Sequence, residues 1–256
     1  MPNRPWTRDE LLVAINLYCR TPFGKLHHNN PDIVALAVHL HRSPSAVAMK
    51  LVNFASIDPS HRARGIKGLR NVSKLDNEVW KEFYSNWEQL AYESQRAFYR
   101  LQEKQYGEVI IEDASDVFPT RKTEMECMVR VRLVQSFFRD TILVNYNSRC
   151  AFCGLNLPLL LIASHIIPWK DSVEKRADPR NGICLCALHD KAFDKGILSI
   201  DVNFGILVSS LAKKKTVSVI HRVGLIDIEG NKITLPRRFM PDLTAIEFHR
   251  SQIFKL

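Results

Sequence analysis

Two closely spaced pairs of metal-binding side chains constrain the fold of this chain more than any other feature of its sequence. Cys150 and Cys153 form a C-x2-C pair, and Cys186 and His189 form a C-x2-H pair. Each pair can bring two ligands to one tetrahedral ion, and the stretch between the pairs is long enough for a β-hairpin. Four protein ligands leave no coordination position open, which is typical of a structural site. The sequence therefore predicts a structural Zn²⁺ bound by these four residues.

The cysteines could instead be small buried side chains or form a disulfide. The first residues, MPNRPWTRDE, lack the apolar segment of a secretion signal, so we expect a cytoplasmic, reducing setting in which zinc is favoured over a disulfide. We expect Cys184 to lie outside the zinc site.

The stretch between and after the two pairs supplies the candidates for chemistry. An apolar run, LPLLLIASHII, presents His165, and the polar loop that follows it ends at Asn181. A single histidine on an apolar strand is more often a packed core residue. Asp190 and Asp194 are spaced i, i+4 and would share one helix face, where they could offer hard oxygen ligands to Mg²⁺ or Mn²⁺. Asp194 could equally accept a hydrogen bond that orders the turn after the helix.

Together these parts resemble the HNH nucleases, the ββα-metal family, in which a strand histidine, a loop asparagine and metal ligands on a helix follow in this order. The motifs that carry the resemblance are S-H-I-x-P-W, N-G-I-x-L-C and H-D-x-x-F-D-x-G. They are similar to the branch of the family found among restriction endonucleases. The resemblance is specific over about residues 130–196 and implies a zinc-stabilised ββα-metal domain.

The resemblance also implies a role for each candidate. His165 would be the general base that activates water against a phosphodiester, and Asn181 would hold the loop so that His165 points correctly. His189 would belong to the zinc site, and the next residue, Asp190, would bind the catalytic metal. The sequence departs from the family at Ser164, because that position usually carries an Asp or His metal ligand.

The N-terminal part predicts a compact helical unit. Thr7 and Glu10 have the spacing of a capping box, and Asn30-Pro31 and Ser43-Pro44 would begin two further helices. This spacing is typical of a helix-turn-helix, and with W-T-x-x-E-L the unit resembles Myb-like DNA-binding domains. The outer face of the third helix would then present three side chains to DNA: Ser45, Lys50 and Asn53. A dimerisation or scaffold module is the alternative.

The rest of the chain predicts an α+β protein in two domains. We expect a helical domain over 1–106, with one long helix from Asp76 to about Gln105, then a linker over 107–121 and the nuclease domain over 122–256. The nuclease domain would begin with a helix at 122–144. After residue 196, the runs ILSID, GILVSS, TVSVIH and KITLP predict additional short strands, and a helix at 241–254 would follow them.

Charge and length set the expected partners. The 256 residues carry a formal net charge of +9, which attracts phosphate polyanions. No apolar run reaches about 18 residues, so we expect no membrane span. The sequence thus favours an HNH endonuclease that hydrolyses DNA, in restriction or phage defence and as a homodimer, since each chain has one centre. The alternative is a non-catalytic, zinc-containing DNA-binding protein in which His165 only packs.

Overall fold

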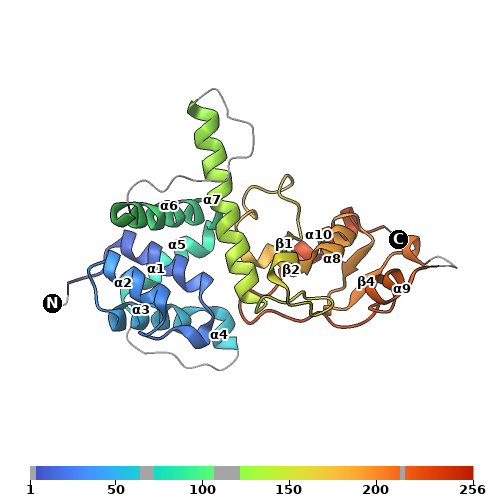
Figure 1. The fold of residues 1–256 in the computed structure, drawn as a ribbon, viewed down its shortest axis with the longest axis horizontal. Coiled ribbons are helices and arrows are strands. Elements are labelled where there is room, and N and C mark those ends of the chain that lie inside the picture. The colour runs from blue at the N-terminus through green and yellow to red at the C-terminus, as the bar shows by residue number, and fades with distance from the viewer. Residues whose placement is uncertain (1–3, 64–71, 107–121, 214–216, 256) are drawn as a thin grey trace. The chain divides into compact units, whose positions relative to one another are not determined.

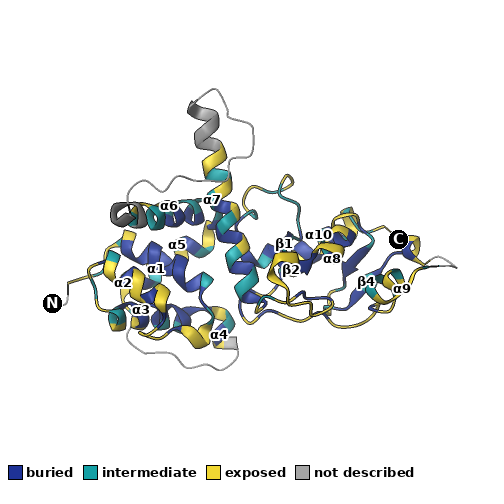
Figure 2. Ribbon diagram, in the orientation of Figure 1, coloured by how far each residue is buried: buried dark blue, intermediate teal, exposed yellow. Residues whose placement is uncertain are grey.

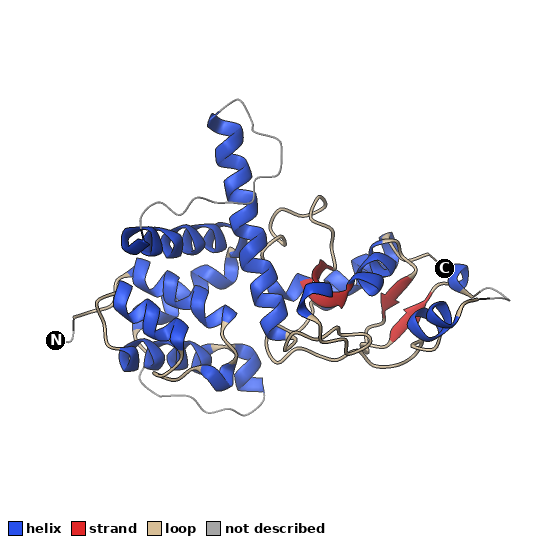
Figure 3. Ribbon diagram, in the orientation of Figure 1, coloured by secondary structure: helices blue, strands red, loops and turns tan. Residues whose placement is uncertain are grey.

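The computed structural model describes residues 4–63, 72–106, 122–213 and 217–255 (Figure 1). It has the mixed α+β composition predicted from the sequence, with many helices and a few short strands (Figure 3). The chain divides into two compact units, Met1–Phe137 and Phe138–Leu256. The division falls inside helix α7 (Lys122–Asn145). The predicted linker at 107–121 lies outside the described residues.

The first unit is helical, and the start of each of its first α-helices is capped as the sequence predicts. Thr7 and Glu10 form a capping box, Asn30 accepts a hydrogen bond from the Asp32 amide, and Ser43 accepts one from the Ala46 amide. The helices are α1 (Arg8–Arg20), α2 (Pro31–His39), α3 (Pro44–Ile57), α4 (Pro59–Ala63), α5 (Lys74–Ser85) and α6 (Trp87–Tyr106), with a short 3₁₀ turn η1 (Phe23–Lys25) after α1.

Helix α1 is the centre of this unit. Nearly all of it is buried, as Figure 2 shows, and it packs against α3, α5 and α6. Tyr18 illustrates the packing, because its ring contacts Phe54 and Trp80 and its hydroxyl donates to the Asp58 carboxylate at 2.7 Å. A helix buried on all sides explains why its apolar residues are not confined to one stripe.

Two predictions for this unit are wrong. The long helix expected from Asp76 is interrupted at Asn86, and its first part begins with Ser73 as the cap. Asp76 is instead buried and accepts hydrogen bonds from the Lys50 ammonium at 2.8 and 2.9 Å. Lys50 and Asn53 therefore do not lie on an outer face of α3, since each is only 7% exposed. A buried ammonium needs a charged partner, and Asp76 provides it.

The second unit contains a ββα arrangement. Strand β1 (Leu161–His165) pairs antiparallel with β2 (Gly182–Cys186), and helix α8 (Ala187–Asp194) follows directly. A second two-stranded sheet pairs β3 (Leu198–Ile200) with β4 (Ile206–Val208). The remaining elements are the 3₁₀ turns η2 (Pro158–Leu160), η3 (Pro179–Asn181) and η4 (Ser210–Ala212), the helix α9 (Val219–His221), the π-helical turn η5 (Arg222–Ile226) and helix α10 (Leu243–Gln252).

The additional strands are confirmed only in part. The runs ILSID and GILVSS form β3 and β4, but the described end of TVSVIH is helical and KITLP contributes a single bridge, between Gly205 and Lys232. Ser218 caps α9 by accepting a hydrogen bond from the His221 amide. Val219 and Ile220 are each 74% exposed, so their β-branched side chains do not pack against a sheet.

The buried core of the second unit connects the ββα part with the second sheet and α10. Ile183 from β2, Phe193 from α8, Leu198 from β3 and Ile246 from α10 are all among its buried residues. This core fixes α8 and α10 beside each other and thereby positions the residues considered next. No helix in the described part of the chain combines the length and apolar character needed to cross a membrane.

Candidate functional site

The four predicted soft ligands converge. Cys150, Cys153, Cys186 and His189 offer ligand atoms that all lie within 4.8 Å of one another. The His189 Nδ1 atom is 3.4 Å from the Cys150 sulfur and 3.2 Å from the Cys186 sulfur, and the sulfurs of Cys153 and Cys186 are 4.0 Å apart. Three sulfurs and one imidazole nitrogen at these separations could hold one tetrahedral metal ion.

Local backbone structure holds this cluster in place. Gly154, with φ +74°, allows the tight turn in which its amide donates to the Cys150 carbonyl at 2.8 Å. On the other side, His189 Nε2 donates to the Gly224 carbonyl of η5 at 2.7 Å. Because that nitrogen carries the proton, the lone pair of Nδ1 faces the sulfurs, as a metal ligand requires.

Cys184 lies outside the cluster. It precedes Cys186 by two residues on β2, and alternation places both side chains on the same face of the strand. What separates it is distance along the strand, about 6.6 Å for two residues. Burial raises the pKa of the Cys184 thiol to about 12, so this residue remains a protonated, apolar part of the core.

His165 lies at the end of β1, opposite Gly182. The ring of Phe138, from α7, stacks on its imidazole with centroids 3.9 Å apart, and Trp169 packs edge-on at 5.6 Å. Gly182 permits this approach, because a Cβ there would collide with the side chains of Phe138 and Ile142. The site therefore depends on a glycine in the strand beside the histidine.

The hydrogen bonding of His165 defines which nitrogen is free. Its Nε2 lies 2.9 Å from the Arg176 carbonyl oxygen, which can only accept, so Nε2 carries the proton. The neutral ring then has its lone pair on Nδ1. Burial lowers the pKa of His165 below its usual value, which favours this neutral form. The histidine is therefore prepared to accept a proton at Nδ1.

Asn181 connects the end of β1 to the loop that carries Arg176. Its side-chain oxygen accepts from the Ile167 amide at 2.8 Å, and its amide nitrogen donates to the carbonyls of Ile167 and Lys175 at 3.0 and 3.2 Å. Its backbone carbonyl also accepts from the Ile166 amide at 2.9 Å. All of these bonds fix backbone next to His165 or next to Arg176.

The two predicted carboxylates lie near each other on α8. Burial raises the pKa of Asp190, and the neighbouring Ser164 hydroxyl partly offsets this effect. Burial and the charge of Asp190 both raise the pKa of Asp194. Two carboxylates that disfavour each other's ionised forms provide a fitting environment for a divalent cation, which would relieve the repulsion.

Ser164 Oγ supports the same interpretation. Its residue is only 3% exposed, and the hydroxyl has no hydrogen bond within 3.5 Å to any part of the chain that the structure describes. Buried polar groups normally have a partner, and because this hydroxyl lies close enough to Asp190 to lower the pKa of that carboxyl, it is suited to hydrogen-bond a water bound to an ion there. The residues present thus fit a divalent cation with oxygen ligands.

The sequence did not reveal the residues that hold His165. Trp169 stands in the S-H-I-x-P-W motif, but nothing in the spacing indicated that its ring would contact the histidine. Arg176 gave no signal, because its contribution is a backbone carbonyl. Phe138 stands in the run RLVQSFFR, which resembles the helix that leads into the HNH centre, but the run did not indicate that its ring would contact His165.

Comparison with known proteins matches parts of the chain. Residues 150–201 match the family model described as HNH endonuclease, and this segment is therefore an HNH endonuclease domain. Among solved structures, the chain is similar to one described as a modification-dependent TagI restriction endonuclease, with 20% identity and a TM-score of 0.36. That match covers 45% of this chain and 37% of the other, little more than a third of its length. No curated protein matches the chain.

Proposed function

We propose that this protein is a metal-dependent endonuclease that hydrolyses DNA phosphodiester bonds. The observation that carries the proposal is the orientation of His165 within an HNH domain: Nε2 donates to the Arg176 carbonyl and leaves Nδ1 as the basic atom. A packed core histidine needs no neighbouring pair of carboxylates. Asp190 and Asp194 on the adjoining helix provide that pair.

In this proposal His165 takes the proton from the attacking water. The general base must be neutral at working pH, and burial of the imidazole between Phe138 and Trp169 favours its neutral form. Asn181 keeps in place the backbone that follows His165 and the backbone next to Arg176. The aromatic contacts and the amide hydrogen bonds together reduce the motion of the base.

Two kinds of metal follow from the two kinds of ligand. Cys150, Cys153, Cys186 and His189 would hold a structural Zn²⁺, whose binding is coupled to folding. Asp190 and Asp194 would hold Mg²⁺ or Mn²⁺, with the Ser164 hydroxyl hydrogen-bonded to a ligand water. Such an ion, when bound, stabilises the charge on the phosphate and the departing oxygen.

The proposed substrate is duplex DNA and the proposed setting is restriction or phage defence in the cytoplasm. The net charge of +9 supports a polyanionic substrate without specifying its sequence. With one reaction centre per chain, a homodimer would cut both strands. The helical unit at residues 1–106 would recruit DNA or form the dimer. The exposed apolar side chains Val34, Val38 and Met49 of α2 and α3 favour contact with protein.

Plasmid cleavage tests the function. Purified protein with Mg²⁺ or Mn²⁺ is expected to cut plain or modified plasmid, and His165→Ala should lower the rate by about 10²-fold or more. Zinc content and DNA affinity should stay at the parental level. His28→Ala, at an exposed histidine of the N-terminal unit, is the matched control and should cut normally.

The same assay separates this function from its rival. A non-catalytic DNA-binding protein would shift DNA in a gel and leave every plasmid intact in both metals. If a folded, zinc-loaded His165→Ala protein cut plasmid at the parental rate, His165 would have no role in the mechanism.

A further inference from the structure

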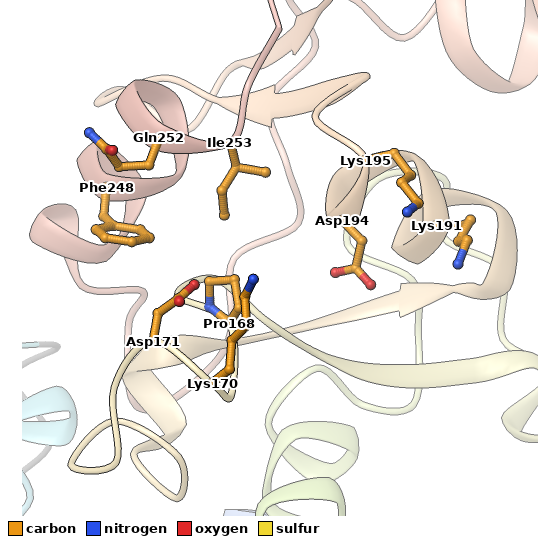
Figure 4. Close-up of a pocket in the computed structure, with 9 residues that line it drawn as sticks. All are labelled: Pro168, Lys170, Asp171, Lys191, Asp194, Lys195, Phe248, Gln252 and Ile253. Carbon is orange, nitrogen blue, oxygen red and sulfur yellow. The ribbon is translucent and has the colours of Figure 1, made fainter.

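A pocket of about 500 Å³ lies between helix α8, the loop after β1, and helix α10 (Figure 4). Its two sides differ in chemistry. Lys191 and Asp194 come from α8 and Lys195 from the residue after it. Phe248 and Ile253 lie on the opposite side, from α10 and the residue after it. The volume lies within the range of roughly 300–1,000 Å³ that is usual for small-molecule sites.

The side of the pocket formed by α10 is fixed firmly to α8. The His249 ring stacks on Phe193 with centroids 3.7 Å apart, its Nε2 donates to the Phe193 carbonyl at 3.1 Å, and its Nδ1 accepts from the Ser199 hydroxyl at 2.9 Å. His249 is directly next to Phe248 in the chain. The part of α10 that carries Phe248 is therefore held by the buried contacts of the adjacent residue.

A second attachment lies beyond α10. Gly196, with φ +69°, follows α8 and accepts a hydrogen bond from the Lys255 amide at 2.9 Å. A Cβ at Gly196 would collide with the Ile253 carbonyl, so only glycine allows this approach. The His249 contacts and the hydrogen bond between Gly196 and Lys255 both hold the C-terminal segment against α8. The pocket is therefore formed before any ligand enters, which lowers the entropic cost of binding.

We propose that this pocket binds one unpaired nucleotide of the substrate beside the bond that is cut. The proposal rests on the proposed nuclease function, because Asp194 both lines the pocket and lies near Asp190. The exposed face of a base would stack on Phe248, which is half-buried, and the flanking phosphates would lie near Lys191 and Lys195. A nucleotide stacked inside a duplex has both base faces covered, so the pocket would take one that is flipped out of the duplex substrate.

The lining favours a nucleotide over a free anion. Three lysines, Lys170, Lys191 and Lys195, are partly balanced by Asp171 and Asp194, so the pocket has only a small excess of positive charge. A site for phosphate alone would not need an apolar side. A nucleotide uses both parts of the lining, since its base is apolar on its faces and its phosphates are charged.

Calorimetric titration of the wild-type protein without added Mg²⁺ or Mn²⁺ tests this proposal. The probe is thymidine 3′,5′-bisphosphate, with inorganic phosphate as the comparison ligand. We expect the bisphosphate to bind at least about tenfold more tightly than phosphate, and Phe248→Ala to remove about tenfold of that affinity. Leu243→Ala, at a half-exposed position of the same helix outside the pocket lining, is the matched control.

The contribution of the positively charged lining residues is tested by the same titration. Lys195→Ala should weaken bisphosphate binding, whereas Lys74→Ala removes an equal charge from an exposed side chain of the first unit and should change nothing. If Phe248→Ala fails to fold by circular dichroism, Phe248→Leu retains an apolar side chain and should still lose the stacking.

The proposal is overturned if the bisphosphate shows no saturable binding, if phosphate binds equally well, or if both pocket variants bind like their controls. The result is independent of catalysis. Protein that binds the bisphosphate but cuts no plasmid contradicts the nuclease function and leaves the pocket assigned. Protein that cuts plasmid but does not bind the bisphosphate contradicts the pocket alone.

Discussion

The ring of Phe138 lies parallel to the imidazole of His165, with centroids 3.9 Å apart and planes inclined by 9°. Phe138 is itself only 2% exposed, so it cannot move aside without disturbing the core. Helix α7 thus contributes the Phe138 side chain to the site. It excludes water from one face of the base and contributes to the lowered pKa of His165, for which burial is the main cause.

Replacing Phe138 should therefore change the pH dependence of cleavage. In Phe138→Ala the imidazole becomes better solvated, so the pKa of His165 should rise toward its usual value near 6.5. Since the base must be neutral, the acidic limb of the pH–rate profile should move to higher pH. Activity should fall more at pH 6 than at pH 8, and the profile of initial rates measures this difference.

Phe23→Ala is the control for Phe138→Ala, because its ring packs on His61 in the first unit. Its pH–rate profile should match that of the parent. An unchanged acidic limb in a folded Phe138→Ala protein would show that the stacked ring does not shield the base.

The metal cluster gives a prediction that does not depend on catalysis. Purified protein should contain about one zinc per chain, and Cys150→Ser should lose the metal and much of its thermal stability. Cys184→Ser is a demanding control, because this thiol is also buried but lies outside the cluster. It should retain the zinc even if its melting temperature falls. Elemental analysis distinguishes the two variants, and equal zinc content in both would contradict the assigned ligands.

The carboxylates of α8 should differ in importance. Asp190→Asn is expected to reduce cleavage more than Asp194→Asn, because Asp190 lies beside the buried Ser164 hydroxyl and is the less exposed of the two carboxylates. Both effects should be partly relieved at higher Mn²⁺ concentration, which cleavage rates across a metal titration would reveal. Asp227→Asn, at an exposed position of the same unit, should have no effect. Equal activity of all three variants would place the metal elsewhere.

Acid should destabilise the second unit through His249. Burial lowers its pKa to about 4, so the folded state binds this proton less readily than the unfolded state. Its contribution is therefore complete above pH 6.5 and is lost as the pH falls from 6.5 toward 4, by about 3 kcal/mol at most. His249→Gln should show a flatter dependence of unfolding free energy on pH in this window. Urea unfolding at several pH values, with His28→Ala as control, measures the slope.

The sequence was sufficient for the features that depend on spacing. Capping at Thr7, Asn30 and Ser43 follows from adjacent residues, and the metal cluster follows from two pairs that each fit one ion. These local rules hold because each involves only a few residues and depends little on tertiary contacts.

The sequence was insufficient for the features that tertiary contacts determine. Lys50 looks like a surface residue of α3, and only its pairing with Asp76 explains its burial. The Arg176 carbonyl that orients His165 has no sequence signature, because any residue supplies one. The described part of the run TVSVIH, residues 217–221, has strand-forming residues, yet Ser218 caps a helix and no neighbouring strand pairs with it in the described residues. Strand formation depends on a partner that the local sequence does not specify.

The side chain of Asn181 offers the sharpest test of how the base is held. Asn181→Asp keeps the shape and the oxygen that accepts from the Ile167 amide, but it removes the donors to the carbonyls of Ile167 and Lys175. A carboxylate oxygen would then face those carbonyls, so the loop next to Arg176 should shift and its hydrogen bond to His165 should weaken. We expect cleavage to fall by about ten- to a hundredfold with zinc content unchanged. In ¹⁵N NMR spectra, His165 should change from one tautomer, protonated at Nε2, to a mixture. Reduced cleavage with an unaltered His165 tautomer would mean that Asn181 acts on the substrate instead of on the base.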